Sequence, residues 1–299
     1  MPCPAHNKCI QTEFTRRSFL PLGESADAGV RQARKINKMS TMDSETHFET
    51  MPLYKYLACP DGATRMDWVR QILVEHNFFF ASRQSFNDPF DCAVPDLSQI
   101  PGTFLKRFVE EFVDRRFSDA NEAEKLQMIT KLMSVNALED IRKGLQNKVD
   151  KAGIVCFSKA RDDILMWAHY ADKHKGLCLE FDGSSNCIFF GESQPVEYDE
   201  YTPIPLHEDS NRQVTRAILT KSKHWSYERE YRIFRPDAAG QKLNYPVELL
   251  TGIIFGCMMP EKVRESVKQW SEQGGCRVAF FEARLRITEF GLDIVRVDC

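Results

Sequence analysis

Short apolar stretches with a strand-like period recur along the chain after residue 50. Some alternate apolar with polar residues, and others are continuously apolar, as buried strands often are. The predicted strands are 53–57 (LYKYL), 78–82 (FFFAS), 154–158 (IVCFS), 177–182 (LCLEFD), 195–201 (PVEYDEY), 224–234 (HWSYEREYRIF), 249–256 (LLTGIIFG), 278–285 (VAFFEARL) and 292–297. Helical spacing of apolar residues predicts helices at 64–76, 163–171, 210–221 and 260–274.

Between residues 101 and 150 the apolar residues are spaced three and four positions apart, as in helices. Phe104, Phe108 and Phe112 recur every four residues, and Asn136 with Glu139 resembles a helix capping pair. This segment predicts an insertion of two to four helices. Because strands outnumber the long helices and the helices cluster early, the fold class is α+β, with a mixed or antiparallel sheet.

Residues 1–50 lack a periodic apolar pattern and predict a largely disordered extension before a single domain at 51–299. The piece TRRSFLPLG is similar to a twin-arginine export signal, but a polar segment follows where an apolar one is needed. Met39, Met42 and Met51 leave open where translation starts.

Composition narrows the class of protein. The chain has 299 residues, 42% hydrophobic and 28% charged, with a formal charge of −3. This balance gives no overall attraction to nucleic acid or to anionic membrane, and no apolar run is long enough to span a bilayer. The ten cysteines form no C-x-x-C pair, so we expect a reducing cytoplasm and no cysteine metal site.

The stretch Ile154–Asp182 is dense in groups that can do chemistry. Asp162 or Asp163 is placed to cap a short helix and Gly176 to end it. Trp167, His169 and Tyr170 share one helical turn, so they cannot all face the core. His169 and His174 are five residues apart, which does not fit a zinc-binding helical pair. Glu180 lies in a buried strand and needs a partner, for which Arg229, Arg232 and Lys175 are candidates.

The segment FNDPFDC supplies Asn87, Asp88 and Asp91 after a buried strand. Rigid acidic turns at strand ends often carry binding sites. The alternative is ordinary turn chemistry, in which Asn and Asp bond to their own backbone.

The strand predicted at 224–234 places Glu228 and Glu230 on one face, about 7 Å apart. Such a pair could share acid and base roles or bind a ribose and a cationic transition state. The alternative is a solvated strand face with Arg229 paired to an acid. The common nucleotide-binding and hydrolase motifs, including G-x-G-x-x-G, G-x-x-x-x-G-K-[ST], H-E-x-x-H and G-x-S-x-G, are absent.

Four blocks together resemble the bacterial family catalogued as domain of unknown function 2971. They are LYKYL, ILVEHNFFFASRQSFNDPFDC, GIVCFSKARDDILMWAHYADKHKGLCLEFD and WSYEREYRIF. The resemblance runs from about residue 53 to about residue 297 and implies no activity.

A second likeness is to ADP-ribosyltransferase-type folds, on the first strand LY-x-Y and the late E-x-E. It implies a split sheet that holds NAD as substrate, a cytoplasmic enzyme, and a role as a toxin or in phage defence. Glu230 would contact the nicotinamide ribose, Glu228 would prepare an acceptor, and Ser82 or Ser85 would be the second-strand element. Tyr56, beside Tyr54, would stack on the nicotinamide. The further pocket residues would be Asn87, Asp88, Asp91, Trp167, His169, Tyr170 and Glu180.

Three functions stay open at this point. The first is NAD-dependent ADP-ribosyl transfer to an unknown protein or nucleic-acid acceptor, by a protein of unknown oligomeric state that does not enter a membrane. The second is a metal-dependent phosphodiesterase or nuclease, in which Asp88, Asp91, Glu180 and Glu228 converge on Mg²⁺. The third is a non-catalytic sensing or interaction module, in which an arginine satisfies each of Glu180, Glu228 and Glu230 and no pocket opens beside them.

Overall fold

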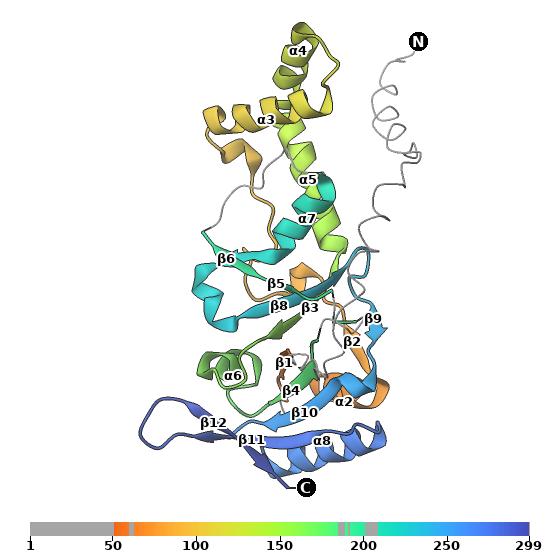
Figure 1. The fold of residues 1–299 in the computed structure, drawn as a ribbon, viewed down its shortest axis with the longest axis vertical. Coiled ribbons are helices and arrows are strands. Elements are labelled where there is room, and N and C mark those ends of the chain that lie inside the picture. The colour runs from red at the N-terminus through yellow and green to blue at the C-terminus, as the bar shows by residue number, and fades with distance from the viewer. Residues whose placement is uncertain (1–50, 60–62, 185–188, 191, 201–208, 299) are drawn as a thin grey trace, which may run out of the picture. The chain divides into compact units, whose positions relative to one another are not determined.

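The computed structural model describes residues 51–59, 63–184, 189–190, 192–200 and 209–298. The predicted disordered extension, residues 1–50, lies outside this range. Helices and strands mix around an eight-stranded sheet, which confirms the α+β class (Figure 1). In spatial order its strands are β12 (Leu292–Val297), β11 (Ala279–Leu285), β10 (Leu250–Phe255), β4 (Leu177–Asp182), β1 (Pro52–Leu57), β3 (Gly153–Ser158), β8 (Glu230–Arg235) and β5 (Gln194–Pro195).

The sheet is nearly divided between β1 and β3. Strand β1 pairs with β4 along its whole length, and β3 pairs with β8 along its whole length. Between β1 and β3 the register contains a single pair, Tyr54 with Ser158. Beyond that pair, Lys55 Nζ donates to the Cys156 carbonyl at 3.1 Å, in place of a backbone ladder bond. The two halves of the sheet therefore meet at one point and diverge from it.

Alternate side chains of β1 point to opposite faces of the sheet and pack into two different hydrophobic clusters. Leu53 packs with α2 (Ala63–Glu75) and α8 (Glu261–Gln273) on one side of the sheet. Tyr54 and Tyr56 pack with α6 (Ile164–Tyr170) on the other side. Because successive strand residues point to opposite faces, this alternation directs the two tyrosines toward the polar residues of β3 and β8.

The predicted helical insertion is present as three helices. They are α3 (Gly102–Arg116), α4 (Glu122–Leu132) and α5 (Val135–Lys151). The predicted capping pair is wrong, because Ser134 caps α5 and the capping box is Asn121 with Glu124 on α4. Helix α5 packs against α7 (Ser210–Leu219), which carries the chain into β7 (Thr220–Ser222).

The single strand predicted at 224–234 is wrong in its first half. Ser222 accepts a hydrogen bond from the His224 amide and begins a 3₁₀ helix, η3 (Lys223–Glu228). Arg229 then adopts a left-handed backbone with φ 43°, and β8 starts at Glu230. Glu228 and Glu230 consequently come from a helix end and a strand start, rather than from one strand face.

Smaller corrections concern the other boundaries. The strand predicted at 78–82 is β2 (Asn77–Phe79), which pairs with β9 (Lys242–Asn244). His76, and not Asn77, takes the left-handed conformation after α2. Gly176 does not end α6 by a positive φ; a Cβ there would lie 2.1 Å from the Leu57 carbonyl oxygen, so the residue is small for close packing.

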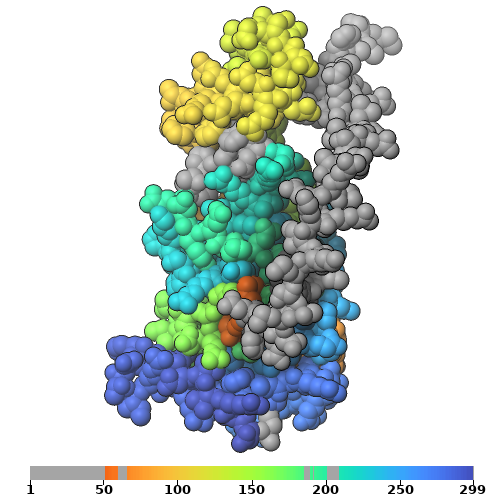
Figure 2. Space-filling view, in the orientation of Figure 1, coloured from red at the N-terminus to blue at the C-terminus, as the bar shows by residue number. Residues whose placement is uncertain are grey.

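One edge of the sheet is formed by the β11–β12 hairpin, dark blue in Figure 2. Two large side chains at its tip, Ile287 and Phe290, are fully exposed. Among the described residues, no helix combines the length and apolar character that a membrane span requires.

Candidate functional site

The centre of the site is the ammonium group of Lys221, which three carboxylates surround. Its Nζ lies 2.5 Å from Glu228 Oε2, 3.1 Å from Glu230 Oε2 and 3.3 Å from Asp91 Oδ2. The lysine comes from β7, the aspartate from the loop after β2, and the glutamates from the η3–β8 junction. All four side chains are buried, so the charges are held in a medium that screens them weakly.

Arg232 is the second cation of this cluster and is completely buried. Its guanidinium binds both oxygens of Asp91, at 2.8 and 2.7 Å, and both oxygens of Glu230, at 2.7 and 2.8 Å. It also donates to the Ile218 carbonyl at 2.6 Å. Paired bidentate bonds of this kind fix geometry as well as charge, so Asp91 and Glu230 are held rigidly.

Glu228 is bound less completely than Glu230. Its Oε1 accepts a hydrogen bond of 2.5 Å from the hydroxyl of Tyr170, the last residue of α6, and its Oε2 faces Lys221. Asn87 Nδ2 donates to the same tyrosine hydroxyl at 3.4 Å. Ser158 Oγ donates to the Glu228 carbonyl at 2.6 Å and so fixes the end of η3 against β3.

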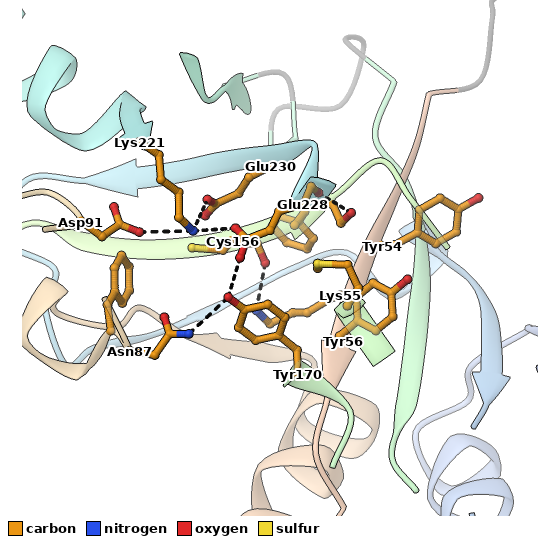
Figure 3. Close-up of a pocket in the computed structure, with 14 residues that line it drawn as sticks. Tyr54, Lys55, Tyr56, Asn87, Asp91, Cys156, Tyr170, Lys221, Glu228 and Glu230 are labelled. Atoms are coloured by element: carbon orange, nitrogen blue, oxygen red, sulfur yellow. Dashed lines mark hydrogen bonds and ion pairs between the residues drawn. The ribbon is translucent and has the colours of Figure 1, made fainter. Parts of the chain in front are cut away.

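A cavity of about 150 Å³ opens beside Glu228, at the point where β1 and β3 diverge (Figure 3). Its walls are mostly aromatic and apolar, with the charged cluster along one side. The lining side chains are Tyr54, Lys55, Tyr56, Phe86, Asn87, Asp91, Cys156, Phe157, Ser158, Met166, Tyr170, Lys221, Glu228 and Glu230. A space of this size holds one six-membered ring.

The pKa values of the two glutamates are shifted in opposite directions. Burial alone would raise the pKa of Glu230, but Arg232 and Lys221 outweigh it and hold that pKa at about 2. Burial raises the pKa of Glu228, and the charge of Glu230 adds to this effect while Lys221 opposes it. A pair of carboxyl groups whose pKa values are driven apart is typical of acid–base sites.

The neighbouring groups respond to the same charges. Burial, followed by the charge of Glu228, raises the pKa of Tyr170, which therefore stays a hydrogen-bond donor. Burial would lower the pKa of Lys221, but Glu230, Asp91 and Glu228 raise it, so this lysine stays protonated. Burial lowers the pKa of Lys55, whose Nζ lies 5.4 Å from the Phe157 ring centroid.

Seven of the residues predicted from sequence meet at this cavity. They are Tyr54, Tyr56, Asn87, Asp91, Tyr170, Glu228 and Glu230. Five others do not line it: Ser82, Asp88, Trp167, His169 and Glu180.

Those five residues have other surroundings. Ser82 caps a short 3₁₀ helix and donates to the Asp150 carbonyl. Trp167 is a core residue, fully buried, and packs edge-on against Tyr56. His169 is exposed, and its ring lies 6.3 Å from that of Trp225. Asp88 accepts hydrogen bonds from the indole nitrogen of Trp225 at 2.6 Å and from the Phe90 amide at 2.9 Å.

Glu180 does have a partner, but not one of the predicted candidates. Its Oε2 lies 3.9 Å from Arg161 Nη1, and its Oε1 accepts from the Thr251 hydroxyl at 3.2 Å. Burial, followed by the charge of the Glu180 carboxylate, raises the pKa of Tyr54 to about 12.

Sequence reasoning missed Lys221, Ser158 and Lys55 as members of the site. Lys221 ends the predicted helix 210–221 on the same side as Ala217 and Ile218, and this position on an apolar face was the available signal. Ser158 ends a buried strand, and a polar residue in that position was the available signal. The sequence predicts Arg232 only as a candidate partner of Glu180, whereas in the structure it binds Asp91 and Glu230.

The carboxylates expected to hold Mg²⁺ do not form such a site. Asp91 and Glu228 converge on the ammonium of Lys221 instead, and Glu180 pairs with Arg161. The described part of the chain contains no group of three or more His, Cys, Asp or Glu residues able to hold a metal ion.

Comparison with known families confirms the first resemblance. Residues 166–233, which run from α6 to β8, match the family described as "Protein of unknown function (DUF2971)". This segment carries Tyr170, Lys221, Glu228, Glu230 and Arg232. No curated protein and no solved structure matches the chain.

Proposed function

We propose that the chain is an ADP-ribosyltransferase-like enzyme that cleaves the bond between nicotinamide and ribose in NAD. The observation that carries the proposal is the cavity at the divergence of β1 and β3, with Glu228 on its wall. Its volume of about 150 Å³ suits the nicotinamide ring and not the whole dinucleotide. The remainder of NAD would extend outside this cavity.

The charge of the cavity wall suits this ring. In the charged cluster, Asp91, Glu228 and Glu230 face two cations, Lys221 and Arg232, which leaves one negative charge in excess when all five groups are ionised. Lys55 also lines the cavity, and burial lowers its pKa; the neutral form of Lys55 leaves that negative charge in excess. The nicotinamide ring of NAD carries a positive charge, which both carboxylates and aromatic faces attract.

The same wall stabilises the transition state of glycosidic cleavage. When the carbon–nitrogen bond breaks, nicotinamide leaves with the bonding electron pair and positive charge develops on the ribose carbon. A preorganised carboxylate stabilises such a charge most strongly where water is excluded. Water or another acceptor then attacks that carbon and loses a proton to a base.

Glu228 is better placed than Glu230 to touch the substrate. Two carboxylate oxygens offer about four acceptor positions. Glu228 uses two of them, for Tyr170 and Lys221, whereas Glu230 uses three, for Arg232 and Lys221. The raised pKa of Glu228 also makes it the stronger base. We therefore assign contact with the ribose and acceptor to Glu228, and the positioning of Lys221 to Glu230.

In this proposal Ser158 replaces Ser82 as the second-strand residue, because Ser158 lines the cavity and bonds to Glu228. Tyr54, Tyr56 and Tyr170 form the aromatic wall. The acceptor is a protein, a nucleic acid or water.

The test is nicotinamide release from NAD by the purified protein, measured by chromatography with and without candidate acceptors. Glu228→Gln keeps the size of the side chain and removes its charge, so we expect release to fall at least about 100-fold. The matched control is Glu272→Gln, an exposed glutamate on α8, which should release nicotinamide at the wild-type rate. Wild-type protein that leaves NAD intact with every acceptor, or equal rates for Glu228→Gln and wild type, would contradict the proposal.

The structure has only part of what the non-catalytic alternative requires. It required an arginine on each of Glu180, Glu228 and Glu230 and no pocket beside them. Arginines do bind Glu180 and Glu230, but Glu228 faces a lysine and a tyrosine and borders a cavity. An intact NAD pool together with saturable binding of another small molecule would favour this alternative.

A further inference from the structure

The amine of Lys55 lines the cavity beside Glu228 and has no part in the proposed cleavage of NAD. The side chain is half-buried and reaches from β1 toward β3, where its Nζ donates to the Cys156 carbonyl at 3.1 Å (Figure 3). A neutral side-chain amide could donate the same hydrogen bond. The hydrogen bond alone therefore does not require a primary amine at this position.

Lys55 differs from Lys221, the other lysine of the cavity, in its partners. Three carboxylates surround the Nζ of Lys221, the farthest at 3.3 Å. Among the described residues, no carboxylate forms an ion pair with Lys55. Its side-chain neighbours include the rings of Phe157 and Phe78, whose centroids lie 5.4 and 5.9 Å from its Nζ. The cavity thus contains one lysine that is fully paired with carboxylates and one that is not.

These surroundings favour the neutral form of Lys55. Burial lowers its pKa, although Cys156, Glu230 and Cys178 act in the opposite direction. The two neighbouring rings attract an ammonium group only weakly compared with a buried carboxylate. A desolvated lysine without an ion pair loses its proton more readily, and the neutral amine is the form that attacks carbon.

The same cavity also holds a group that can exchange a proton with a reacting oxygen. Burial raises the pKa of Glu228, and its Oε1 accepts a hydrogen bond from the Tyr170 hydroxyl. A carboxyl group with a raised pKa can give up a proton and take it back during one reaction. The aromatic side chains of Tyr54, Tyr56 and Phe86 form much of the remaining wall and limit access of water.

We propose that Lys55 is an amine nucleophile that forms an imine with an aldehyde carbon placed in this cavity. The lone pair of Nζ attacks the carbonyl carbon while Glu228 protonates the carbonyl oxygen. The nitrogen then returns a proton to Glu228, and the new hydroxyl takes this proton and leaves as water. The nitrogen lone pair closes the carbon–nitrogen double bond, which gives a protonated imine beside the ionised Glu228.

Two kinds of molecule supply such a carbon. One is a free aldehyde of the size of a six-membered ring, which the cavity volume of about 150 Å³ accommodates. The other is C1 of the opened ribose in the ADP-ribose that NAD cleavage leaves behind. Only the second source rests on the proposed function.

The test is reductive trapping of the purified full chain with pyridine-3-carboxaldehyde and sodium cyanoborohydride, which reduces the imine and spares the aldehyde. Peptide mass spectrometry measures the label on each lysine at pH 7. The matched comparison is Lys159, which is also half-buried, has a pKa lowered by burial and lies 5.4 Å from the Tyr231 ring, but does not line the cavity. We expect Lys55 to be labelled at least about tenfold faster than Lys159.

Two further measurements separate a built site from a merely reachable amine. Pyridine-3-methanol, which has the same ring and no carbonyl group, should protect Lys55 and leave the labelling of Lys159 unchanged. Glu228→Gln should slow the labelling of Lys55 at least about tenfold, with no effect on Lys159. Equal labelling of Lys55 and Lys159, or absence of protection by the alcohol, would overturn the proposal.

NAD in place of the aldehyde distinguishes the two sources. ADP-ribose trapped on Lys55 would identify the opened ribose as the ligand, and trapping of the small aldehyde alone would identify a separate aldehyde. Either result upholds Lys55 as the nucleophile. Selective aldehyde trapping in a protein that leaves NAD intact would retain Lys55 and refute the proposed function. NAD cleavage with Lys55 labelled no faster than Lys159 would do the reverse.

Discussion

The hydroxyl of Tyr170 lies 2.5 Å from Oε1 of Glu228, and this hydrogen bond links the last residue of α6 to the last residue of η3. The donor comes from the stretch 154–182 and the acceptor from the stretch 224–234, which are both rich in polar groups. Their meeting makes the two stretches parts of one site. It also leaves the other oxygen of Glu228 to Lys221.

Replacing Tyr170 with Phe should destabilise the fold by about 1–2 kcal/mol, because it removes a hydrogen bond to a buried carboxylate. The same change should raise the pKa of Glu228 further, since the Tyr170 hydrogen bond favours the ionised form. Urea unfolding measures the first effect, and a carbon-13 NMR titration of the glutamate carboxyls measures the second. Tyr231→Phe is the control, because that hydroxyl has no hydrogen bond to a described residue.

Lys221→Met should destabilise the protein by about 3–5 kcal/mol, since it leaves Asp91, Glu228 and Glu230 buried with fewer positive charges. The neighbouring Lys223→Met removes a 60% exposed side chain and should cost less than about 0.5 kcal/mol.

Adding Glu228→Gln to Lys221→Met should recover part of this loss, because it removes one of the unpaired charges. Thermal and urea unfolding of the single and double variants form a double-mutant cycle. Additive losses in that cycle would mean that Lys221 and Glu228 do not interact as the structure has them.

The contribution of Glu230 to stability should fall, by a loss on the order of 3 kcal/mol, as the pH drops from 4.5 toward 2, because its pKa is lowered to about 2 in the folded protein from 4.5 in an unperturbed chain. A lowered folded-state pKa stabilises the protein above the unfolded value, and protonation removes that gain. Glu228 has the opposite sign: its raised pKa stabilises the fold at low pH, and the gain is lost as the pH rises above 4.5.

Urea unfolding of wild type and Glu228→Gln from pH 2 to 7 separates the two contributions. The variant should keep the loss below pH 4.5 and should no longer lose stability above it. A variant curve that parallels the wild-type curve throughout would refute the assignment of opposite shifts.

Gly176→Ala should destabilise the fold by more than about 3 kcal/mol, because the new Cβ would lie 2.1 Å from the Leu57 carbonyl and 3.0 Å from the Ala171 backbone. Gly144→Ala is the matched control, since a Cβ there, in the middle of α5, would meet no described atom within 4 Å beyond its chain neighbours and the helix backbone. That substitution should stabilise the protein by about 0.5–1 kcal/mol. Thermal unfolding of both variants checks the pair, and similar effects in both would contradict the close approach of β1 to the turn after α6.

The central strands were predictable because their signals are local. The apolar runs at 154–158 and 249–256 specify buried strands whatever packs on them, and four-residue spacing of Phe104, Phe108 and Phe112 specifies a helix. The start of β8 was not predictable in this way. Polar and apolar residues alternate in HWSYEREYRIF through Glu228, as in a strand. However, Ser222 caps a 3₁₀ helix at the start of this segment, and the left-handed backbone of Arg229 ends it.

The amino-acid pattern alone predicted the α+β class, the helical insertion and the family resemblance, and it singled out Glu228, Glu230, Asp91 and Tyr170. These follow from residue types and from periods along the chain. Which charged side chains pair with one another follows from the three-dimensional fold and could not be read from the pattern. Lys221 is separated from Asp91 by 130 positions, and its 3.3 Å contact depends on α5 and α7 bringing β7 to the loop after β2. Because these charged groups are buried, they lose their hydration, and a buried charge without an oppositely charged partner strongly destabilises the fold.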